Sequence, residues 1–177
     1  MKNTPKNKLY IGCGKDIKKD YINLDIVKLP GVDVAHNLNK YPWPFKDNTF
    51  EEIYCANVLE HLESIVMPME EIWRISKNKA RVIIIVPISP GIGACADPTH
   101  KSFYSFLTFN YFRPEDALNY YSKARFNIIK RKIIFHQYLK PLTWFFNLSE
   151  KMQKFHSTFL AFLIPAYTLD VELEVVK

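Results

Sequence analysis

Short apolar runs, separated by turns of glycine, proline and polar residues, dominate the first half of the chain. Such runs are typical of buried strands in a parallel sheet. The run at 81–87 is the clearest, because it is β-branched and has no polar alternation, so it is expected to be a central strand covered on both faces. The same reasoning predicts shorter strands at 8–11, 21–24, 32–35 and 50–55.

Helices are expected between and after these strands. An amphipathic pattern predicts a helix over 69–76, and residues 57–62 are expected to start a helix that stops before Pro68. Residues 114–121 are expected to form another short helix, with Pro114 in its first turn.

The second half of the chain has a different character. Residues 127–135 predict a strand, and 169–176 alternate between apolar and acidic side chains, which indicates a half-buried strand. The stretch 139–165 is apolar and aromatic. It could form a lid or a surface for an apolar or glycolipid substrate, or it could be core packing or a dimer face. Nearby lysines would permit peripheral contact with anionic lipid: Lys140, Lys151 and Lys154.

A glycine turn marks the first candidate site. Gly12 and Gly14 follow the run at 8–11, and Asp25 ends the next run. Strand, glycine turn, strand and acid form a nucleoside pocket in α/β sheets. Asp25 lies only 11 positions after Gly14, which is too close for the long helix that a dinucleotide pyrophosphate requires. A ligand with a ribose but no phosphate fits better, and S-adenosylmethionine (SAM) is the common one.

Four segments, taken together, resemble the class I SAM-dependent methyltransferases, in particular their small type 11-like group. Residues 9–14 resemble motif I of that family, 23–25 the acid after its second strand, 33–38 its adenine loop and 50–62 its fourth-strand segment. The resemblance implies an α/β, Rossmann-like SAM methyltransferase fold. Its sheet would be mostly parallel with an antiparallel last strand, and helices would cover both faces.

The resemblance also implies a set of cofactor-binding residues. Asp25 would accept hydrogen bonds from the ribose hydroxyls, and Leu38 would pack on the adenine. Asn37 stands where the family often has an acid, and Asn57 would contact the methionine part of SAM or cap a helix. The complete expected set is Ile11, Gly12, Cys13, Gly14, Asp25, Ile26, Asn37, Leu38 and Asn57.

Two histidines are the candidate catalytic residues. His100 follows Asp97 in a segment just after the run at 81–87, where substrate is expected to enter, and a near-neutral imidazole can take a proton from a hydroxyl. His61 is the second candidate. Both could instead be structural, with Asp97 and His100 bonding the loop backbone. No metal is expected, because Asn57 occupies the first position of the E-x-x-E-H pattern with which some related O-methyltransferases bind one.

Composition and charge bear on the number of domains, the class of partner and the cellular location. The 177 residues are 48% hydrophobic, which is enough for one domain over 1–177, with 88–125 and 139–165 forming its substrate side or lid. The net charge is +6, but the lysines are scattered, so nucleic acid is a disfavoured partner. Three cysteines without paired spacing suit a reducing cytosol, and the polar residues 1–8 carry no export signal, so a cytoplasmic location is expected.

The expected function is SAM-dependent transfer of a methyl group to a small-molecule, glycan or lipid-linked acceptor, with oxygen the favoured atom. The alternatives are an RNA methyltransferase, supported only by the positive charge, and a catalytically silent SAM-binding protein. A nicotinamide oxidoreductase is disfavoured by the Gly14–Asp25 spacing. A homodimer and a peripheral membrane contact both remain open.

Overall fold

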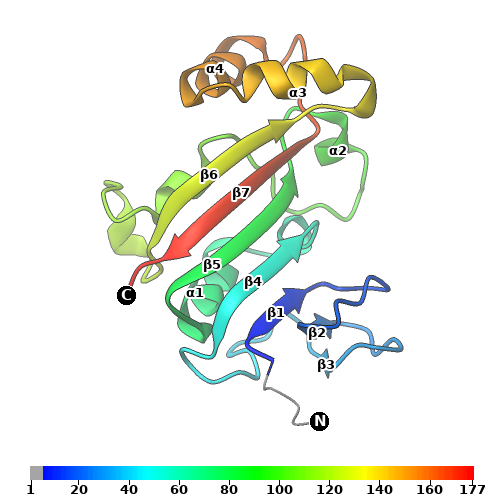
Figure 1. Cartoon of the computed structure of the whole chain (residues 1–177), viewed down its shortest axis with the longest axis vertical. Helices are drawn as coiled ribbons and strands as arrows, with labels where there is room; N and C mark the ends of the chain where they lie inside the picture. The colour runs from blue at the N-terminus through cyan, green and yellow to red at the C-terminus, as the bar shows by residue number, and fades with distance from the viewer. Residues whose placement is uncertain (1–5) are drawn as a thin grey trace.

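The computed structural model describes residues 6–177, apart from the side chain of Asn119. Residues 1–5, which belong to the segment in which no export signal is expected, lie outside the described residues. Residues 6–177 form one mixed sheet of seven strands in the order β3-β2-β1-β4-β5-β7-β6 (Figure 1). The strands are β1 (Lys8–Ile11), β2 (Ile22–Asp25), β3 (Val34–Ala35), β4 (Phe50–Ala56), β5 (Ser76–Pro87), β6 (Phe126–Ile134) and β7 (Thr168–Val175).

The strand directions confirm the predicted topology. β1 to β5 are mutually parallel where they pair, and β7 runs antiparallel to both β5 and β6. The predicted strands are all present within a few residues of their expected bounds. β5 is longer than predicted, because it begins at Ser76, which pairs with Phe50 across an irregularity in the β4–β5 register.

The first helical segments differ from prediction. The helix expected from Asn57 is only a 3-10 turn, η1 (Leu59–His61), and α1 spans Val66–Ile75. Pro68 lies in the first turn of α1 instead of ending a helix. A first-turn proline is tolerated because the first N–H groups of a helix have no partner within it. α1 buries Met69, Ile72 and Ile75 against the sheet.

The helix expected at 114–121 is absent. Instead, the 3-10 turn η2 (Thr108–Phe112) precedes that segment, and the 3-10 turn η3 (Asn119–Tyr121) occupies only its last part. Asp116 accepts a hydrogen bond from the Leu118 N–H at 2.9 Å. Side chains that bond nearby backbone in this way favour turns over helix.

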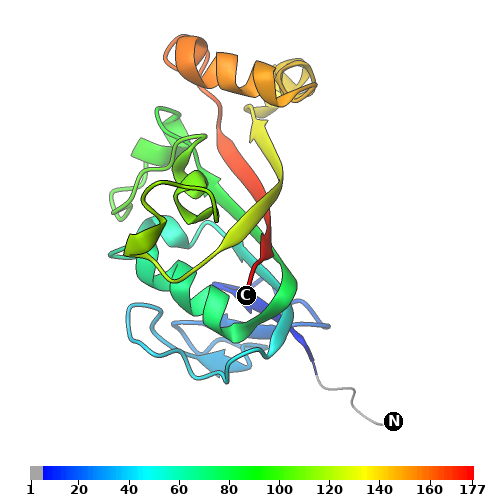
Figure 2. The same ribbon diagram turned by 90° about the vertical axis from the view of Figure 1, so that its left-hand side faces the viewer.

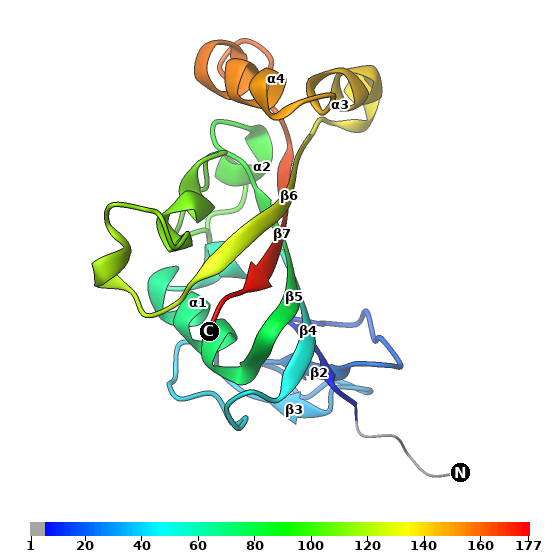
Figure 3. The ribbon, with the colours of Figure 1, turned by 60° about the vertical axis from the view of Figure 1, so that its left-hand side comes forward.

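The two faces of the sheet are covered unequally. The main core includes Val82 and Ile84 of β5 and lies on the face that carries α1 and α2 (Ile92–Cys95) (Figure 3). On the other face, Ile83 and Ile85 are only half-buried. The expectations of helices on both faces and of a fully covered β5 are therefore corrected. The connections between β1, β2, β3 and β4 contain no helix, and the outward side chains of β6 and β7 are charged: Lys130, Lys132, Asp170 and Glu172.

The aromatic stretch forms a helical lobe beyond the ends of β6 and β7 (Figure 2). This lobe consists of the 3-10 turn η4 (Gln137–Leu139), α3 (Lys140–Phe146), α4 (Glu150–Phe155) and the π-helical turn η5 (His156–Leu160). Core packing does not account for most of its aromatic residues, since Trp144 is 70% exposed and Phe162 is 89% exposed. No helix within residues 6–177 is long and apolar enough to cross a membrane.

Candidate functional site

The predicted cofactor residues gather at the carboxyl ends of β1, β2 and β4. Gly12 and Gly14 follow β1, Asp25 ends β2, and Asn57 follows β4. These strands are adjacent and parallel, so their ends meet at one edge of the sheet. This edge is where α/β sheets bind their ligands.

Asp25 fastens the glycine turn to β2. One carboxylate oxygen accepts from the Gly14 N–H at 2.8 Å, and the other accepts from the Val27 N–H at 3.0 Å. The N–H groups of Gly12 and Cys13 both donate to the Leu24 carbonyl. A carboxylate has about four acceptor positions. Asp25 can therefore hold the turn and still accept hydrogen bonds from a ligand.

The two glycines serve different purposes. Gly12 has a φ of +69°, and a Cβ placed on it would lie 2.1 Å from Cγ2 of Val58. Gly14 has a φ of +52°, but a Cβ there would meet nothing within 4 Å. Gly12 is thus required by packing against the segment that follows β4. Gly14 borders open space into which a ligand can approach the backbone.

The residues flanking the turn are mostly buried. Ile11 and Cys13 have almost no exposed surface, so they present backbone groups rather than side chains. Burial raises the pKa of the Cys13 thiol, which keeps it protonated and unreactive. Ile26, in contrast, is 64% exposed beside Asp25 and offers an apolar surface to a ligand.

In the loop that was expected to bind adenine, both candidate residues make contacts within the protein. The side-chain oxygen of Asn37 accepts from the Asn39 N–H at 3.0 Å and so stabilises its own turn. The Leu38 side chain is buried in the main core, and the Leu38 carbonyl accepts from the Trp43 indole at 3.1 Å. Little of the Leu38 side chain is left to cover an adenine ring, contrary to the sequence-based expectation.

Asn57 has an unusual backbone. Its φ is +53°, and its N–H donates to the Ile85 carbonyl at 2.9 Å. Because Val58 is the N-cap of η1 and provides no side-chain cap, the helix-cap interpretation of Asn57 is wrong. A non-glycine residue with positive φ at a cavity is typical of a functional position. The side chain of Asn57 is exposed and lines that cavity.

This cavity has a volume of about 600 Å³ and holds both predicted catalytic histidines. The His61 and His100 rings are 4.9 Å apart between centroids, although they come from different loops. We refer to the space as the histidine cavity. Its lining residues include Asn57, Glu60, His61, Pro87, Asp97 and His100.

Hydrogen bonds define the tautomer of both rings in the neutral state. His100 Nδ1 lies 3.0 Å from the Ala94 carbonyl, which only accepts, so this nitrogen carries the proton. His61 Nδ1 lies 2.9 Å from the Thr99 hydroxyl, which itself donates to Asp97 at 2.6 Å. The hydroxyl has one proton and must therefore accept from His61 Nδ1. In the neutral state both Nε2 atoms keep a lone pair.

The buried environment of Glu60 was not predictable from the sequence. It is 1% exposed, and its Oε2 has no hydrogen-bond partner within residues 6–177. Burial raises the pKa of this carboxyl group. From the sequence, Glu60 and His61 could act in acid/base chemistry, bind a metal or form a structural helix pair, and the structural pair was favoured because nothing in the sequence indicates that the Glu60 side chain turns inward.

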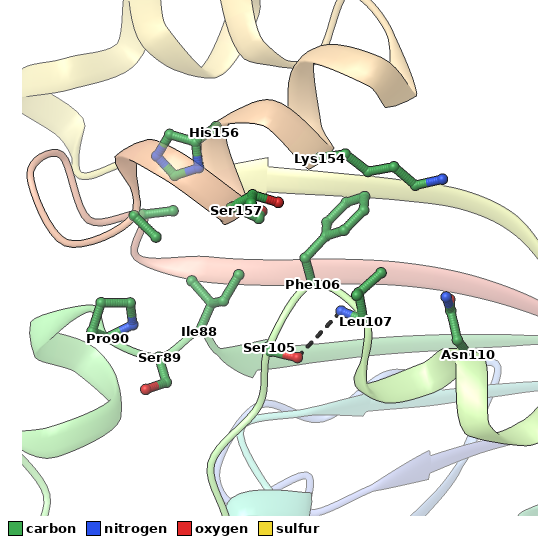
Figure 4. Close-up of a pocket in the computed structure, with 13 residues that line it drawn as sticks. Ile88, Ser89, Pro90, Ser105, Phe106, Leu107, Asn110, Lys154, His156 and Ser157 are labelled. Carbon is green, nitrogen blue, oxygen red and sulfur yellow. Dashed lines mark hydrogen bonds between the residues drawn. The ribbon is translucent and has the colours of Figure 1, made fainter. Parts of the chain in front are cut away.

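A second cavity, of about 370 Å³, lies between the two segments predicted to form the substrate side (Figure 4). We refer to it as the lobe cavity. Figure 4 shows His156 and Ser157 on one side and Ile88–Pro90 on the other. His156 is buried and bonds the Ile164 carbonyl through Nε2, while its Nδ1 and the Ser157 hydroxyl have no partner within the described part of the chain. No pattern in the sequence distinguishes His156 from its aromatic neighbours.

The comparisons with known proteins place the fold. No family model matches the chain. A protein of Methanocaldococcus jannaschii described as uncharacterized is 51% identical over 86 residues, a match that covers 42% of this chain and 38% of that protein. This chain therefore spans well under half the length of that relative.

Solved structures align over nearly the whole chain. A SAM-dependent methyltransferase from Archaeoglobus fulgidus gives a TM-score of 0.62 at 15% identity, covering 94% of this chain and 85% of that one. A putative methyltransferase from Bacillus halodurans gives 0.56 at 10% identity, covering 96% and 92%. Phosphoethanolamine N-methyltransferase 2 from Haemonchus contortus, solved with S-adenosyl-L-methionine, gives 0.57 at 11% identity, covering 96% and 48%.

These matches and the strand order define the class. The chain has the Rossmann-like fold of the class I SAM-dependent methyltransferases. Its similarity to the solved structures is a similarity of fold, at 10–15% sequence identity among the three described.

Proposed function

We propose that this protein binds SAM at the carboxyl ends of β1, β2 and β4 and transfers the methyl group to an acceptor in the histidine cavity. The carrying observation is the continuity between the two sites. Gly12 packs against Val58, and the neighbouring Asn57 lines the histidine cavity. The fold of the solved methyltransferases supports the same arrangement.

The residues present fit SAM. Gly14 borders open space, Asp25 retains acceptor positions for a ribose, and Asn57 offers an exposed amide towards the methionine part. SAM, when bound, supplies a methyl group on a positively charged sulfur that needs no further activation. The protein has to hold the acceptor in line and exclude water.

Oxygen is the acceptor atom that the histidine cavity favours. A hydroxyl must lose a proton as its bond to the methyl carbon forms, and the freed electron pair of the broken carbon–sulfur bond stays on sulfur. His100 Nε2 has a lone pair in the neutral state and takes this proton, with His61 as the second candidate base. Asn37 and Ile26 complete the proposed cofactor contacts.

The lobe cavity supports an acceptor with an apolar portion. It adjoins the histidine cavity along the chain, because Pro87 lines one and Ile88 the other. Its lining combines apolar side chains, among them Ile88, Phe106 and Leu107, with polar ones such as Ser157 and Lys154. The helical lobe, which carries the exposed aromatic residues, contributes Lys154, His156 and Ser157 to this lining. A lipid-linked or glycan hydroxyl compound is thus favoured over a small polar acceptor, and a peripheral contact of this lobe with lipid accords with that choice.

Calorimetry tests the cofactor assignment. SAM and its demethylated product should bind the purified chain, and NADH should not. Asp25→Asn removes one charged acceptor while keeping the shape of the side chain, so it should weaken SAM binding about 10- to 100-fold. Asp20→Asn, at an exposed position in the preceding loop, is the matched control and should bind as the native chain does. Equal affinities for the two variants would refute the assignment.

Labelled methyl transfer into fractionated extracts tests the acceptor. Label in the lipid or glycan fraction is expected, and His100→Ala should abolish most of it while leaving SAM affinity unchanged. Label in RNA would support an RNA methyltransferase instead. SAM binding without transfer to any fraction would support a catalytically silent SAM-binding protein.

A further inference from the structure

Three potential ligand residues converge in the histidine cavity. Glu60 and His61 lie in η1 after β4, and His100 lies in the loop after α2. One ligand atom from each of the three lies within 4.8 Å of the others. Backbone bonds already hold the two segments together, since the Glu60 carbonyl accepts from Lys101 N at 2.7 Å and from Ser102 N at 3.2 Å. The cluster is therefore assembled by the fold itself.

Glu60 needs a partner that the described chain does not provide. Its side chain is almost completely buried and lines the cavity, and its Oε2 is unbonded within residues 6–177. An unpaired buried carboxylate oxygen is costly in free energy. A cation bound from the cavity would satisfy it.

Both histidines are prepared as ligands. Each ring engages its Nδ1–H, His100 with the Ala94 carbonyl and His61 with the Thr99 hydroxyl, so each Nε2 is left with a lone pair. Metal-binding histidines usually have such a partner on the other nitrogen, which sets the tautomer and the ring orientation. Asp97 fixes Thr99 in turn through hydrogen bonds to its hydroxyl and its backbone N–H.

We propose that Glu60, His61 and His100 bind a divalent transition-metal ion of the Zn²⁺ type. Two imidazole nitrogens and one carboxylate suit Zn²⁺ and its neighbours in the first transition row, whereas Mg²⁺ and Ca²⁺ prefer oxygen ligands only. In a tetrahedral Zn²⁺ site with bonds of about 2.0–2.2 Å, the ligand atoms lie about 3.3–3.6 Å apart. The three ligand atoms here lie within 4.8 Å of one another, so the most distant of them would have to approach by about 1.2–1.5 Å on metal binding.

This site departs from the expectation that the chain holds no metal. That expectation rested on Asn57, which interrupts the local E-x-x-E-H pattern. In the structure the third ligand comes instead from His100, in a loop that local spacing does not connect to Glu60 and His61. Three protein ligands leave coordination positions open for a molecule in the cavity.

A bound metal ion would also restrict the class of methyl acceptor, an inference that rests on the proposed function. A hydroxyl bound at an open position loses its proton to solvent more readily. The favoured acceptors are then compounds whose reactive hydroxyl has a neighbouring oxygen that can bind the same ion. In this form His61 and His100 act as ligands and no longer as proton acceptors.

Metal binding is testable without SAM. The full-length chain carrying Cys95→Ser, which removes an exposed thiol, is stripped with a chelator and titrated with ZnCl₂ by calorimetry and with CoCl₂ by visible absorption. One ion per chain is expected, with cobalt bands typical of mixed nitrogen and oxygen ligands and little heat from MgCl₂. Glu60→Gln and His100→Ala should each weaken binding at least about 100-fold.

Matched controls separate this site from chance binding. Glu63→Gln and His136→Ala remove an exposed carboxylate and an exposed imidazole and should bind Zn²⁺ as the parent does. Thr99→Val should weaken binding about 10- to 100-fold by releasing the His61 ring. A cooperative thermal transition of Glu60→Gln confirms that the variant is folded. Zn²⁺ should raise the Tm of the parent but not that of Glu60→Gln.

Two outcomes would overturn the proposal: no stoichiometric Zn²⁺ binding, or equal binding by the parent and Glu60→Gln. If SAM still binds in either case, the proposed function stands and only the metal site fails. If Zn²⁺ binds as expected but SAM does not, the metal site stands and the cofactor assignment fails.

Discussion

Replacing Gly12 by alanine tests how the glycine turn is held against the end of β4. The new Cβ would lie 2.1 Å from Cγ2 of Val58, well inside contact distance, and the backbone φ of +69° disfavours any side chain. Gly14→Ala is the matched control. Its φ of +52° carries a similar conformational cost, but its Cβ would meet nothing within 4 Å.

The expected loss of stability has two parts: a cost for the left-handed backbone conformation in both variants, and a cost for the contact with Val58 in Gly12→Ala alone. A non-glycine residue in the left-handed region costs about 1–2 kcal/mol, and overpacking of a well-filled site costs about 1–3 kcal/mol. Gly12→Ala should therefore lower the free energy of unfolding by about 2–5 kcal/mol, and Gly14→Ala by about 1–2 kcal/mol. For a domain of this size each kcal/mol corresponds to a Tm change of about 2–4 °C.

Urea unfolding followed by far-ultraviolet circular dichroism measures both variants, provided that the denaturant slope stays constant. Val58→Ala adds a second arm. It removes the methyl group that clashes, so the double variant with Gly12→Ala should lose at least about 1 kcal/mol less than the sum of the two single variants. SAM binding should be weakened more by Gly14→Ala than by Gly12→Ala, because the Gly14 Cβ enters the space assigned to the ligand.

Two results would refute this reasoning. One is an equal loss of stability in Gly12→Ala and Gly14→Ala, which would mean that the contact with Val58 is relieved at no cost. The other is strict additivity of Gly12→Ala and Val58→Ala, which would mean that the two positions do not interact.

Three further predictions concern separate parts of the chain. Asn57→Gly should leave the free energy of unfolding unchanged or raise it by up to about 1 kcal/mol in urea, because glycine tolerates a φ of +53°, while calorimetry should show weaker SAM binding. Arg74→Met should lower the free energy of unfolding by about 2–4 kcal/mol in the same assay, since it strands the partly buried Glu71 carboxylate that accepts two of its hydrogen bonds; an unchanged midpoint would contradict this. Burial raises the pKa of Asp170, so its charged form destabilises the fold above that pKa and the penalty disappears as pH falls. Asp170→Asn should therefore raise the Tm at about pH 8 but hardly at about pH 3, where both states carry the proton, and an equal effect at both pH values would exclude this cause.

The strands and the glycine turn were predictable because their signals are local. A β-branched run such as 81–87 and the alternation at 169–176 reflect burial that each residue experiences within its own strand. The helices were less predictable. Asp116 bonds its own loop instead of continuing a helix, and Pro68 lies in a first turn that tolerates it, and neither outcome is visible in hydrophobic spacing.

The site divides in the same way. Asp25, Gly12 and Gly14 were identified from their spacing, since strand, turn and acid are neighbours in sequence as well as in space. The Leu38 side chain is buried in the core, which leaves little of it to cover an adenine ring. This burial depends on core contacts with distant segments. The lone pairs of His61 and His100 depend on hydrogen-bond partners from other segments.

The sequence by itself determined the order of the strands along the chain, the glycine turn with its acid, and the resemblance to a methyltransferase fold. Only the tertiary structure decided that Glu60, His61 and His100 meet, that the helical lobe leaves most of its aromatic residues exposed, and that one sheet face is without helices within residues 6–177. The physical reason is that periodicity and spacing encode local geometry. The partner of a buried carboxylate, or the cover of a sheet face, is instead set by packing between segments far apart in sequence.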